Sequence, residues 1–190
     1  RDEIRRRHGI RDEFVVLFVS NNFRMKGLRL LIKALANIKQ ESLSPFKCLV
    51  LGRDRKDPYI RLANKMGISK EIVFAGSINE PEKYYGAVDL LVHPTFYDAC
   101  SLTVLEALAS GLPVVTTKYN GARGYVVNGR EGFVIEDCRD IKRLSQRISY
   151  FLGKGKRGEI AFNARRRSEN FPMEKNYEEM LTIFWSIKRA

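Results

Sequence analysis

The segment FVVLFVSNNFRMKGLRLLIKALANIK, residues 14–39, combines a strand, a loop and a helix without a break. Residues 14–20 are apolar almost throughout, which is typical of a strand that is covered on both faces. In residues 27–39 leucine and isoleucine recur at the spacing of an amphipathic helix. A buried strand that leads straight into a helix is the repeating unit of a parallel sheet, so this segment predicts an α/β fold.

The same alternation continues along the rest of the chain. Further strands are predicted at residues 46–52, 71–76, 88–94, 114–117 and 131–136. Further helices are predicted at residues 57–66, 80–85, 139–152, 156–170 and 173–188. We therefore expect a single domain over residues 1–190, with about six strands in one Rossmann-like parallel sheet and helices on both faces. In such a sheet ligands bind beyond the carboxyl ends of the strands, so the functional residues should lie in strand-to-helix loops.

Composition limits the class of protein. The chain has 190 residues, of which 44% are hydrophobic and 29% charged, as in an ordinary globular domain. No apolar run approaches the roughly 18 residues of a membrane span, and residues 1–13 lack the apolar centre of a signal peptide. The three cysteines, Cys48, Cys100 and Cys138, are widely spaced and odd in number, which fits neither a disulfide framework nor a zinc site. We expect a cytoplasmic protein.

The formal net charge of +12 indicates an anionic partner, which could be a nucleotide or phosphate, a membrane surface or a nucleic acid. The basic residues gather in residues 1–11, 53–56 and 154–167. They do not alternate with aromatic residues in the manner of a platform for single-stranded nucleic acid. We expect solvated faces, peripheral contact with the inner face of the cell membrane and no nucleic-acid partner. The alternative is a non-catalytic basic α/β module that binds nucleic acid or an anionic membrane.

Residues 20–28, SNNFRMKGL, form the first loop that can carry chemistry. The loop has one glycine and no Lys-Ser/Thr pair, which excludes both a dinucleotide-binding GxGxxG loop and a Walker loop. Arg24 and Lys26 stand at the amino end of a predicted helix, where the helix dipole disfavours cations. Their position is explained if an anion binds between them and the free helix N–H groups. The alternative is that both side chains point into water.

The second such loop opens the segment FYDACSLTVLEALASGLPVVTT, residues 96–117. Asp98 stands just before a predicted helix, where its carboxylate or the hydroxyl of Ser101 would be an ordinary cap. Glu106 lies inside the helix, where a buried and unpaired carboxylate is costly, so it must reach solvent or accept hydrogen bonds. It lies roughly 7 Å along the helix from its start, about the distance from a phosphate to the hydroxyls of its ribose. We predict that Glu106 accepts ribose hydroxyls.

The same residues resemble a known family. DACSLTVLEALASGLPVVTT, in which seven residues separate Asp98 from Glu106, resembles the E-x7-E region of the retaining glycosyltransferases of family 4, the group 1 glycosyltransferases. FVSNNFRMKGLRLLIKAL resembles the loop with which these enzymes grip phosphate. HPTFYDACSLTVLEALASGLPVVTTKYNGA is most similar to the branch that builds lipopolysaccharide core or related surface glycans. The resemblance extends over nearly the whole chain.

The resemblance implies a GT-B enzyme with two Rossmann-like domains, a C-terminal one for the nucleotide-sugar donor and an N-terminal one for the acceptor. This chain resembles the C-terminal half, so the N-terminal acceptor domain is expected to be absent from it, and residues 173–190 resemble the helix that packs back on that domain. The implied reaction is transfer of a hexose from a UDP-sugar to a sugar or lipid-linked glycan acceptor in surface polysaccharide synthesis. The isolated half is expected to be an inactive part of a hexosyltransferase.

The resemblance also implies roles for individual residues. Lys26 and Asp98 would be catalytic, with Lys26 on the donor diphosphate and Asp98 on hydroxyls of the transferred sugar. Glu106 would hold the ribose, and residues 76–78 the base. The implied donor-binding residues are Arg24, Gly27, Gly76, Ser77, Ile78, Ser101, Leu102, Thr103 and Glu106. No cofactor and no bound metal are implied, because cationic side chains and a helix N-terminus offset the charge of the leaving diphosphate.

The chain departs from the family pattern at three positions. Asn21 stands where many relatives have an arginine, five residues before the loop lysine, which leaves Arg24 as the second cation. Asp98 replaces a commoner glutamate, and Ser101 replaces a common glycine, which reduces the room for close backbone approach. His93, at the end of a strand, and Cys100, near a helix start, are interpreted as structural. A reactive thiol at Cys100 is the alternative for that residue.

Overall fold

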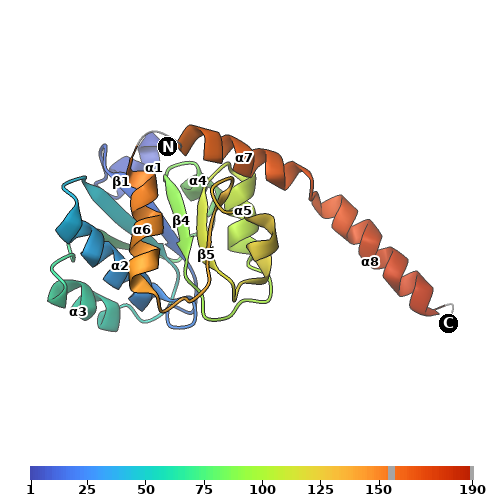
Figure 1. Ribbon diagram of the computed structural model, residues 1–190, viewed down its shortest axis with the longest axis horizontal. Helices are drawn as coiled ribbons and strands as arrows, with labels where there is room; N and C mark the ends of the chain where they lie inside the picture. The colour runs from blue at the N-terminus through green and yellow to red at the C-terminus, as the bar shows by residue number, and fades with distance from the viewer. Residues whose placement is uncertain (154–156, 189–190) are drawn as a thin grey trace.

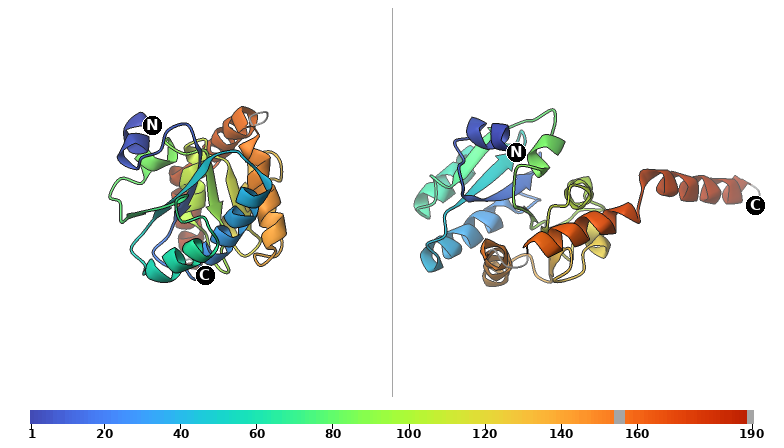
Figure 2. Two further views of the ribbon diagram at one scale, coloured as in Figure 1. Left: turned by 90° about the vertical axis from the view of Figure 1, so that its left-hand side faces the viewer. Right: turned by 90° about the horizontal axis from the view of Figure 1, so that it is seen from above.

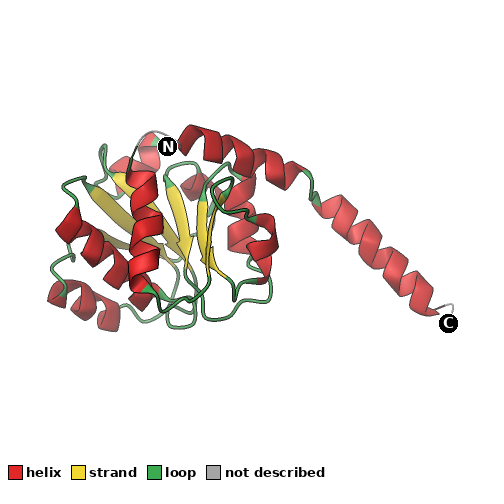
Figure 3. Cartoon of the chain, viewed as in Figure 1, coloured by secondary structure: helices red, strands yellow, loops and turns green. Residues whose placement is uncertain are grey.

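The computed structural model describes residues 1–153 and 157–188 (Figure 1). One six-stranded parallel sheet forms its centre (Figure 3). The strands are β1 (Phe14–Val19), β2 (Phe46–Leu51), β3 (Ile72–Gly76), β4 (Leu90–His93), β5 (Val114–Thr117) and β6 (Gly132–Ile135). The helices are α1 (Asp2–Arg7), α2 (Leu28–Glu41), α3 (Asp57–Lys65), α4 (Glu82–Tyr85), α5 (Leu102–Ala109), the 3-10 helix η1 (Gly121–Tyr125), α6 (Ile141–Leu152), α7 (Arg157–Glu169) and α8 (Met173–Lys188). The predicted α/β alternation is confirmed.

The strand order is β3-β2-β1-β4-β5-β6, and every neighbouring pair is parallel. The chain first builds outward from β1 through β2 to β3. It then returns to the other side of β1 and continues through β4 and β5 to β6. The order therefore reverses between β1 and β4, which is where a parallel sheet forms its ligand-binding crevice, beyond the carboxyl ends of the strands.

Helices cover both faces of the sheet (Figure 2). Val16 and Phe18 of β1 join the core beneath α2, α3 and α6, whereas Val15 and Leu17 join the core beneath α1, α4 and α5. All of these side chains are fully buried, which explains why the strand is apolar at consecutive positions. The two-sided burial was predictable because a strand with one wet face would alternate apolar and polar residues.

The N-terminal segment contains α1, which the sequence analysis did not predict. Arg5 of α1 is buried, and its guanidinium lies 2.8 Å from Oδ2 of Asp89. It also donates to the carbonyls of Ala87, Arg11 and Glu13 at 2.9–3.0 Å. A buried charge needs such complete pairing. The expectation that the basic N-terminal residues form only solvated or membrane-facing surface is therefore wrong for Arg5.

The last helix, α8, extends away from the sheet (Figure 1). Several large apolar side chains on it are exposed, among them Tyr177, Ile183 and Phe184. Within the described residues, no helix combines the length and apolarity that a bilayer crossing requires.

Candidate functional site

An open cavity of about 330 Å³ lies at the carboxyl ends of β1 and β4, where the strand order reverses. Most of the predicted site residues line it: Lys26, Ser77, Ile78, Asp98, Ser101, Leu102 and Thr103. The structure thus brings together the loop after β1, the loop after β3 and the start of α5. Arg24, Gly27, Gly76 and Glu106 lie outside the cavity lining.

Lys26 and Asp98 form an ion pair in the cavity. The Nζ of Lys26 lies 2.7 Å from Oδ2 of Asp98 and donates a second hydrogen bond to the carbonyl of Tyr97 at 3.0 Å. The two side chains are only 19% and 15% exposed, so the pair is far better shielded from water than a surface ion pair. Asp98 does not cap α5, because its carboxylate turns toward Lys26.

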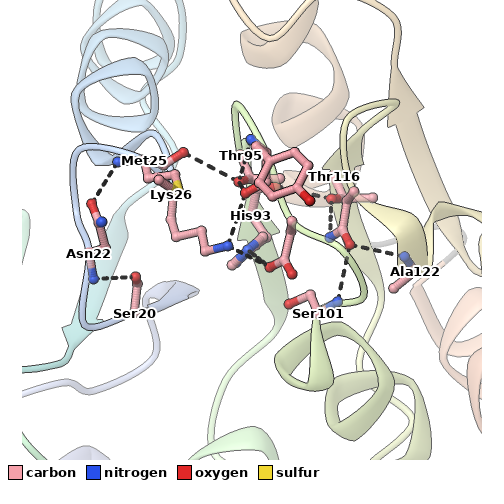
Figure 4. Close-up of polar contacts among 12 residues, drawn as sticks. Ser20, Asn22, Met25, Lys26, His93, Thr95, Ser101, Thr116 and Ala122 are labelled. Atoms are coloured by element: carbon pink, nitrogen blue, oxygen red, sulfur yellow. Dashed lines mark hydrogen bonds and ion pairs between the residues drawn. The ribbon is translucent and has the colours of Figure 1, made fainter.

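His93, the last residue of β4, reaches the same carboxylate. Its Nε2 lies 3.3 Å from Oδ2 of Asp98, and Figure 4 shows His93 and Lys26 converging in the site. The hydrogen bond from His93 and then the hydrogen bond and charge of Lys26 hold the pKa of Asp98 well below its usual range, against the opposing effect of desolvation. Asp98 is therefore a carboxylate at neutral pH. Such a group accepts hydrogen bonds and is a poor proton donor.

The loop that carries Lys26 is fixed at both ends. The side chain of Asn22 accepts from the N–H of Met25 at 2.9 Å (Figure 4). The carbonyl of Met25 accepts from the N–H of Phe96 at 2.9 Å. Gly27 has a left-handed φ of 80°, and a Cβ there would lie 2.2 Å from the carbonyl oxygen of Pro94. Gly27 thus lets the first loop touch the segment after β4, which positions Lys26 without itself lining the cavity.

The start of α5 is held by Asn120, which the sequence analysis missed. Asn120 is fully buried, and its Oδ1 accepts from the N–H of Ser101 at 3.3 Å and of Ala122 at 3.0 Å. Ser101 is the N-cap residue of α5, but its hydroxyl makes no capping hydrogen bond. The first N–H groups of a helix have no partner within the helix, so those of Leu102 and Thr103 are suited to an anionic ligand.

The sequence predicted that Glu106 either reaches solvent or accepts hydrogen bonds, and in the structure it does both. Its side chain is exposed, and its Oε2 accepts a hydrogen bond from the hydroxyl of Tyr85 at 2.6 Å. Burial and then this hydrogen bond raise the pKa of Tyr85, which keeps the phenol protonated as a donor. Contact between Glu106 and a ribose stays a prediction, as does contact between Gly76 and a base.

A cation other than Arg24 stands beside the cavity. Arg53 follows Gly52, a lining residue, and its Nε donates to the hydroxyl of Ser77 at 3.2 Å. Its backbone N–H donates to Oδ1 of Asn21 at 3.0 Å. Both arginines are exposed and outside the cavity lining, but Arg53 bridges two residues of the cavity wall through its hydrogen bonds to Ser77 and Asn21. The signal for Arg53 was available in the sequence, since Arg53 directly follows the second predicted strand and opens the basic cluster of residues 53–56, but this cluster carries no recognisable motif.

The cysteines differ in position. Cys48 and Cys138 are buried within the core beneath α2 and α6. Cys100 is exposed and lines the cavity.

Comparison with known proteins gives the family. The family model for glycosyl transferases group 1 matches residues 1–167. The chain is 31% identical over 147 residues to the lipopolysaccharide glucosyltransferase WaaG of Escherichia coli, an alignment that covers 77% of this chain and 39% of WaaG. It is 27% identical over 179 residues to the capsular polysaccharide biosynthesis glycosyltransferase CapM of Staphylococcus aureus, which covers 92% of this chain and 47% of CapM.

Two solved structures have a fold similar to that of this chain. The crystal structure of WaaG matches with a TM-score of 0.83 and 29% identity over 89% of this chain and 46% of WaaG. Anabaena HepE, solved in complex with UDP and glucose, matches with a TM-score of 0.83 and 22% identity over 97% of this chain and 51% of HepE. The chain thus spans about half or less of each of these proteins, and its sheet is a Rossmann-like unit of the GT-B fold. The chain belongs to the group 1 glycosyltransferases.

Proposed function

We propose that this chain is the C-terminal, donor-binding half of a retaining glycosyltransferase. The reaction proposed is transfer of a hexose from a nucleotide-sugar, specifically a UDP-sugar, to a sugar or lipid-linked glycan in surface polysaccharide synthesis. The observation that carries the proposal is the pairing of Lys26 with Asp98 at the crevice between β1 and β4. A cation for phosphate and an acceptor for sugar hydroxyls thus stand side by side where a parallel sheet binds its ligand.

The proposed chemistry relies on charge rather than on proton transfer by this half. Lys26 and the first N–H groups of α5 stabilise the negative charge that develops on the leaving diphosphate, without a bound metal. Asp98 is held ionised, so it accepts sugar hydroxyls and stabilises positive charge that develops on the sugar ring. Asp98, whose pKa is held low, is a weak base, so the leaving diphosphate is proposed to take the proton of the acceptor hydroxyl.

The acceptor site is proposed to lie in a second domain. The relatives described above are about twice as long as this chain, which supports a missing N-terminal domain. The exposed apolar side chains of α8 support the same arrangement, because a helix of this kind is stabilised by burying such a face against a partner. The chain alone is proposed to bind donor and not to transfer sugar. The complete enzyme is proposed to act at the inner face of the membrane, where a lipid-linked acceptor is accessible.

Calorimetric titration of the chain with UDP, GDP and ADP tests this proposal. We expect one nucleotide to bind selectively, with the same affinity in EDTA and only a modest loss at high salt. Binding of any polyanion to the basic surface would instead weaken steeply as salt rises. Glu106→Ala should weaken the selected nucleotide at least tenfold if the carboxylate holds the ribose. Glu136→Ala, which removes an exposed carboxylate away from the cavity lining, is the matched control.

Three results would contradict the proposal. Binding that EDTA abolishes would show a metal-dependent site. Equal binding of all nucleotides that disappears at high salt would indicate the basic-module alternative. Absence of binding both by the chain and by the same chain joined to its acceptor domain would exclude a donor site here.

A further inference from the structure

His93 is held rigidly at the end of β4. Its side chain is 2% exposed, and its ring stacks on Phe18 at a centroid distance of 6.4 Å and an interplanar angle of 20°. Its carbonyl accepts a hydrogen bond from the hydroxyl of Thr116 on β5 at 3.0 Å. Strand pairing and ring packing therefore fix both the backbone and the imidazole plane.

The contacts of the imidazole define its protonation. Nε2 lies 3.3 Å from Oδ2 of Asp98, which as a carboxylate only accepts hydrogen bonds, so Nε2 carries a proton. Nδ1 is buried and has no hydrogen-bond partner among the described residues. A second N–H at that position would bury a charged donor without an acceptor, and burial lowers the pKa of His93 accordingly. The stable form is the neutral Nε2–H tautomer.

The two carboxylate oxygens of Asp98 therefore have different hydrogen-bond partners. His93 and Lys26 both donate to Oδ2, at 3.3 Å and 2.7 Å. Within the part of the chain that the structure describes, Oδ1 of Asp98 accepts no hydrogen bond from a side chain. If Lys26 turns toward a bound phosphate, His93 remains as the donor that keeps Oδ2 in place.

We propose that His93 is a positioning residue whose neutral imidazole anchors Oδ2 of Asp98 and so presents Oδ1 to a hydroxyl of the transferred sugar. This inference rests on the proposed donor site. The role of His93 is not evident from its position at the end of a buried strand, because His93 acts only through Asp98. The role concerns the sugar part of the donor and leaves the nucleotide part to other residues.

Two variants separate positioning from packing. His93→Gln keeps an N–H donor near the place of Nε2, whereas His93→Phe keeps a flat ring against Phe18 and loses the donor. Each variant and the unmodified chain are titrated with UDP and UDP-glucose, and with GDP and GDP-mannose. The quantity compared is the ratio of nucleotide-sugar affinity to nucleotide affinity. We expect His93→Phe to reduce this ratio about tenfold, the effect of one charge-assisted hydrogen bond, with nucleotide affinity within about threefold. His93→Gln should restore most of the ratio.

The outcomes distinguish this inference from the proposed function. If the unmodified chain binds no nucleotide, the donor site itself fails. If it binds nucleotide and His93→Phe leaves the ratio unchanged, or if the unmodified chain gains no affinity from the sugar, His93 does not act through Asp98 on the sugar. Equal losses of UDP and UDP-glucose affinity in both variants would indicate a packing role and overturn the inference.

A nitrogen NMR measurement tests the tautomer without ligand. The chain has two histidines, so the His8→Gln variant assigns both sets of ring signals. We expect His93 to show a pyrrole-type Nε2 and a pyridine-type Nδ1 at pH 7. The opposite tautomer, or a doubly protonated ring, would contradict the proposed donation to Asp98.

Discussion

Lys26 and Asp98 lie 72 residues apart in the sequence, yet Nζ of Lys26 lies 2.7 Å from Oδ2 of Asp98. The contact exists because β1 and β4 are neighbours and the loops that follow them meet at one edge of the sheet. The Lys26–Asp98 contact joins the two loops that the sequence predicted to contain the functional residues.

Lys26→Gln should have two effects. We expect nucleotide affinity to fall at least tenfold, because a charge-assisted contact to phosphate is lost. The free energy of unfolding should also fall by about 1–2 kcal/mol, since the pair with Asp98 is largely buried. Lys118→Gln is the control: Lys118 pairs with Glu136 at 3.7 Å near the surface, so its loss should change stability by less than about 0.5 kcal/mol. Equal effects of the two variants on calorimetry and urea unfolding would contradict this prediction.

Arg53 and Arg24 are the rival sources of a second cation, and the geometry favours Arg53. Arg53→Gln should weaken nucleotide binding several-fold, because it removes the charge beside Ser77 and Asn21 on the cavity wall. Arg24→Gln makes the same change of charge on a residue that makes no hydrogen bond to the cavity wall within the described part of the chain, and nucleotide affinity should stay within about twofold. Titrations in low and moderate salt compare the two. A larger effect at Arg24 would restore the role that the family resemblance implied for it.

Gly27→Ala tests the close approach of the two loops. The new Cβ would lie 2.2 Å from the carbonyl oxygen of Pro94, so either loop must move. Gly67→Ala is a matched control, because Gly67 has a similar φ of 70° and open space around its missing Cβ. The control should lose about 1 kcal/mol from the left-handed backbone alone, and Gly27→Ala should lose about 1–3 kcal/mol more from overpacking. Urea unfolding measures both. Equal losses would show that the approach to Pro94 is unimportant for stability.

The stability of the chain should fall as pH falls below about 6.5, in part through His93. Burial lowers the pKa of His93 in the folded state, so the unfolded chain binds a proton more readily there. The stability contribution is therefore present above the unfolded pKa and is lost as pH drops through the window below it. Asp98 favours the protonated ring and Lys26 opposes it, with burial the largest effect. His93→Gln should flatten the pH dependence of the unfolding free energy between pH 7 and pH 5, and an unchanged slope would contradict this prediction.

Much of the fold could be predicted because its strands are apolar on both faces and its long helices have a clear period. The short helices α1 and η1 could not be predicted, since α1 is largely charged, with a single apolar residue, and η1 lies in a glycine-rich turn. The sequence also indicated which loops form the site. Some residues of the site could not be predicted, because they act through contacts between distant parts of the chain. Asn120 accepts a hydrogen bond from the start of α5, and His93 contacts Asp98 although its sequence context is that of an ordinary strand residue.

The Lys26–Asp98 pair also has a consequence for the binding of small anions. Nζ of Lys26 already lies 2.7 Å from the carboxylate of Asp98, so a phosphate that binds Lys26 replaces one negatively charged partner by another. Inorganic phosphate brings no further contacts to favour that exchange. Under the proposed function, a nucleotide-sugar would add base, ribose and sugar contacts, and one of its hydroxyls would replace the ammonium on Asp98. The site is therefore self-neutralised, and any anion that binds Lys26 must compete with the carboxylate of Asp98.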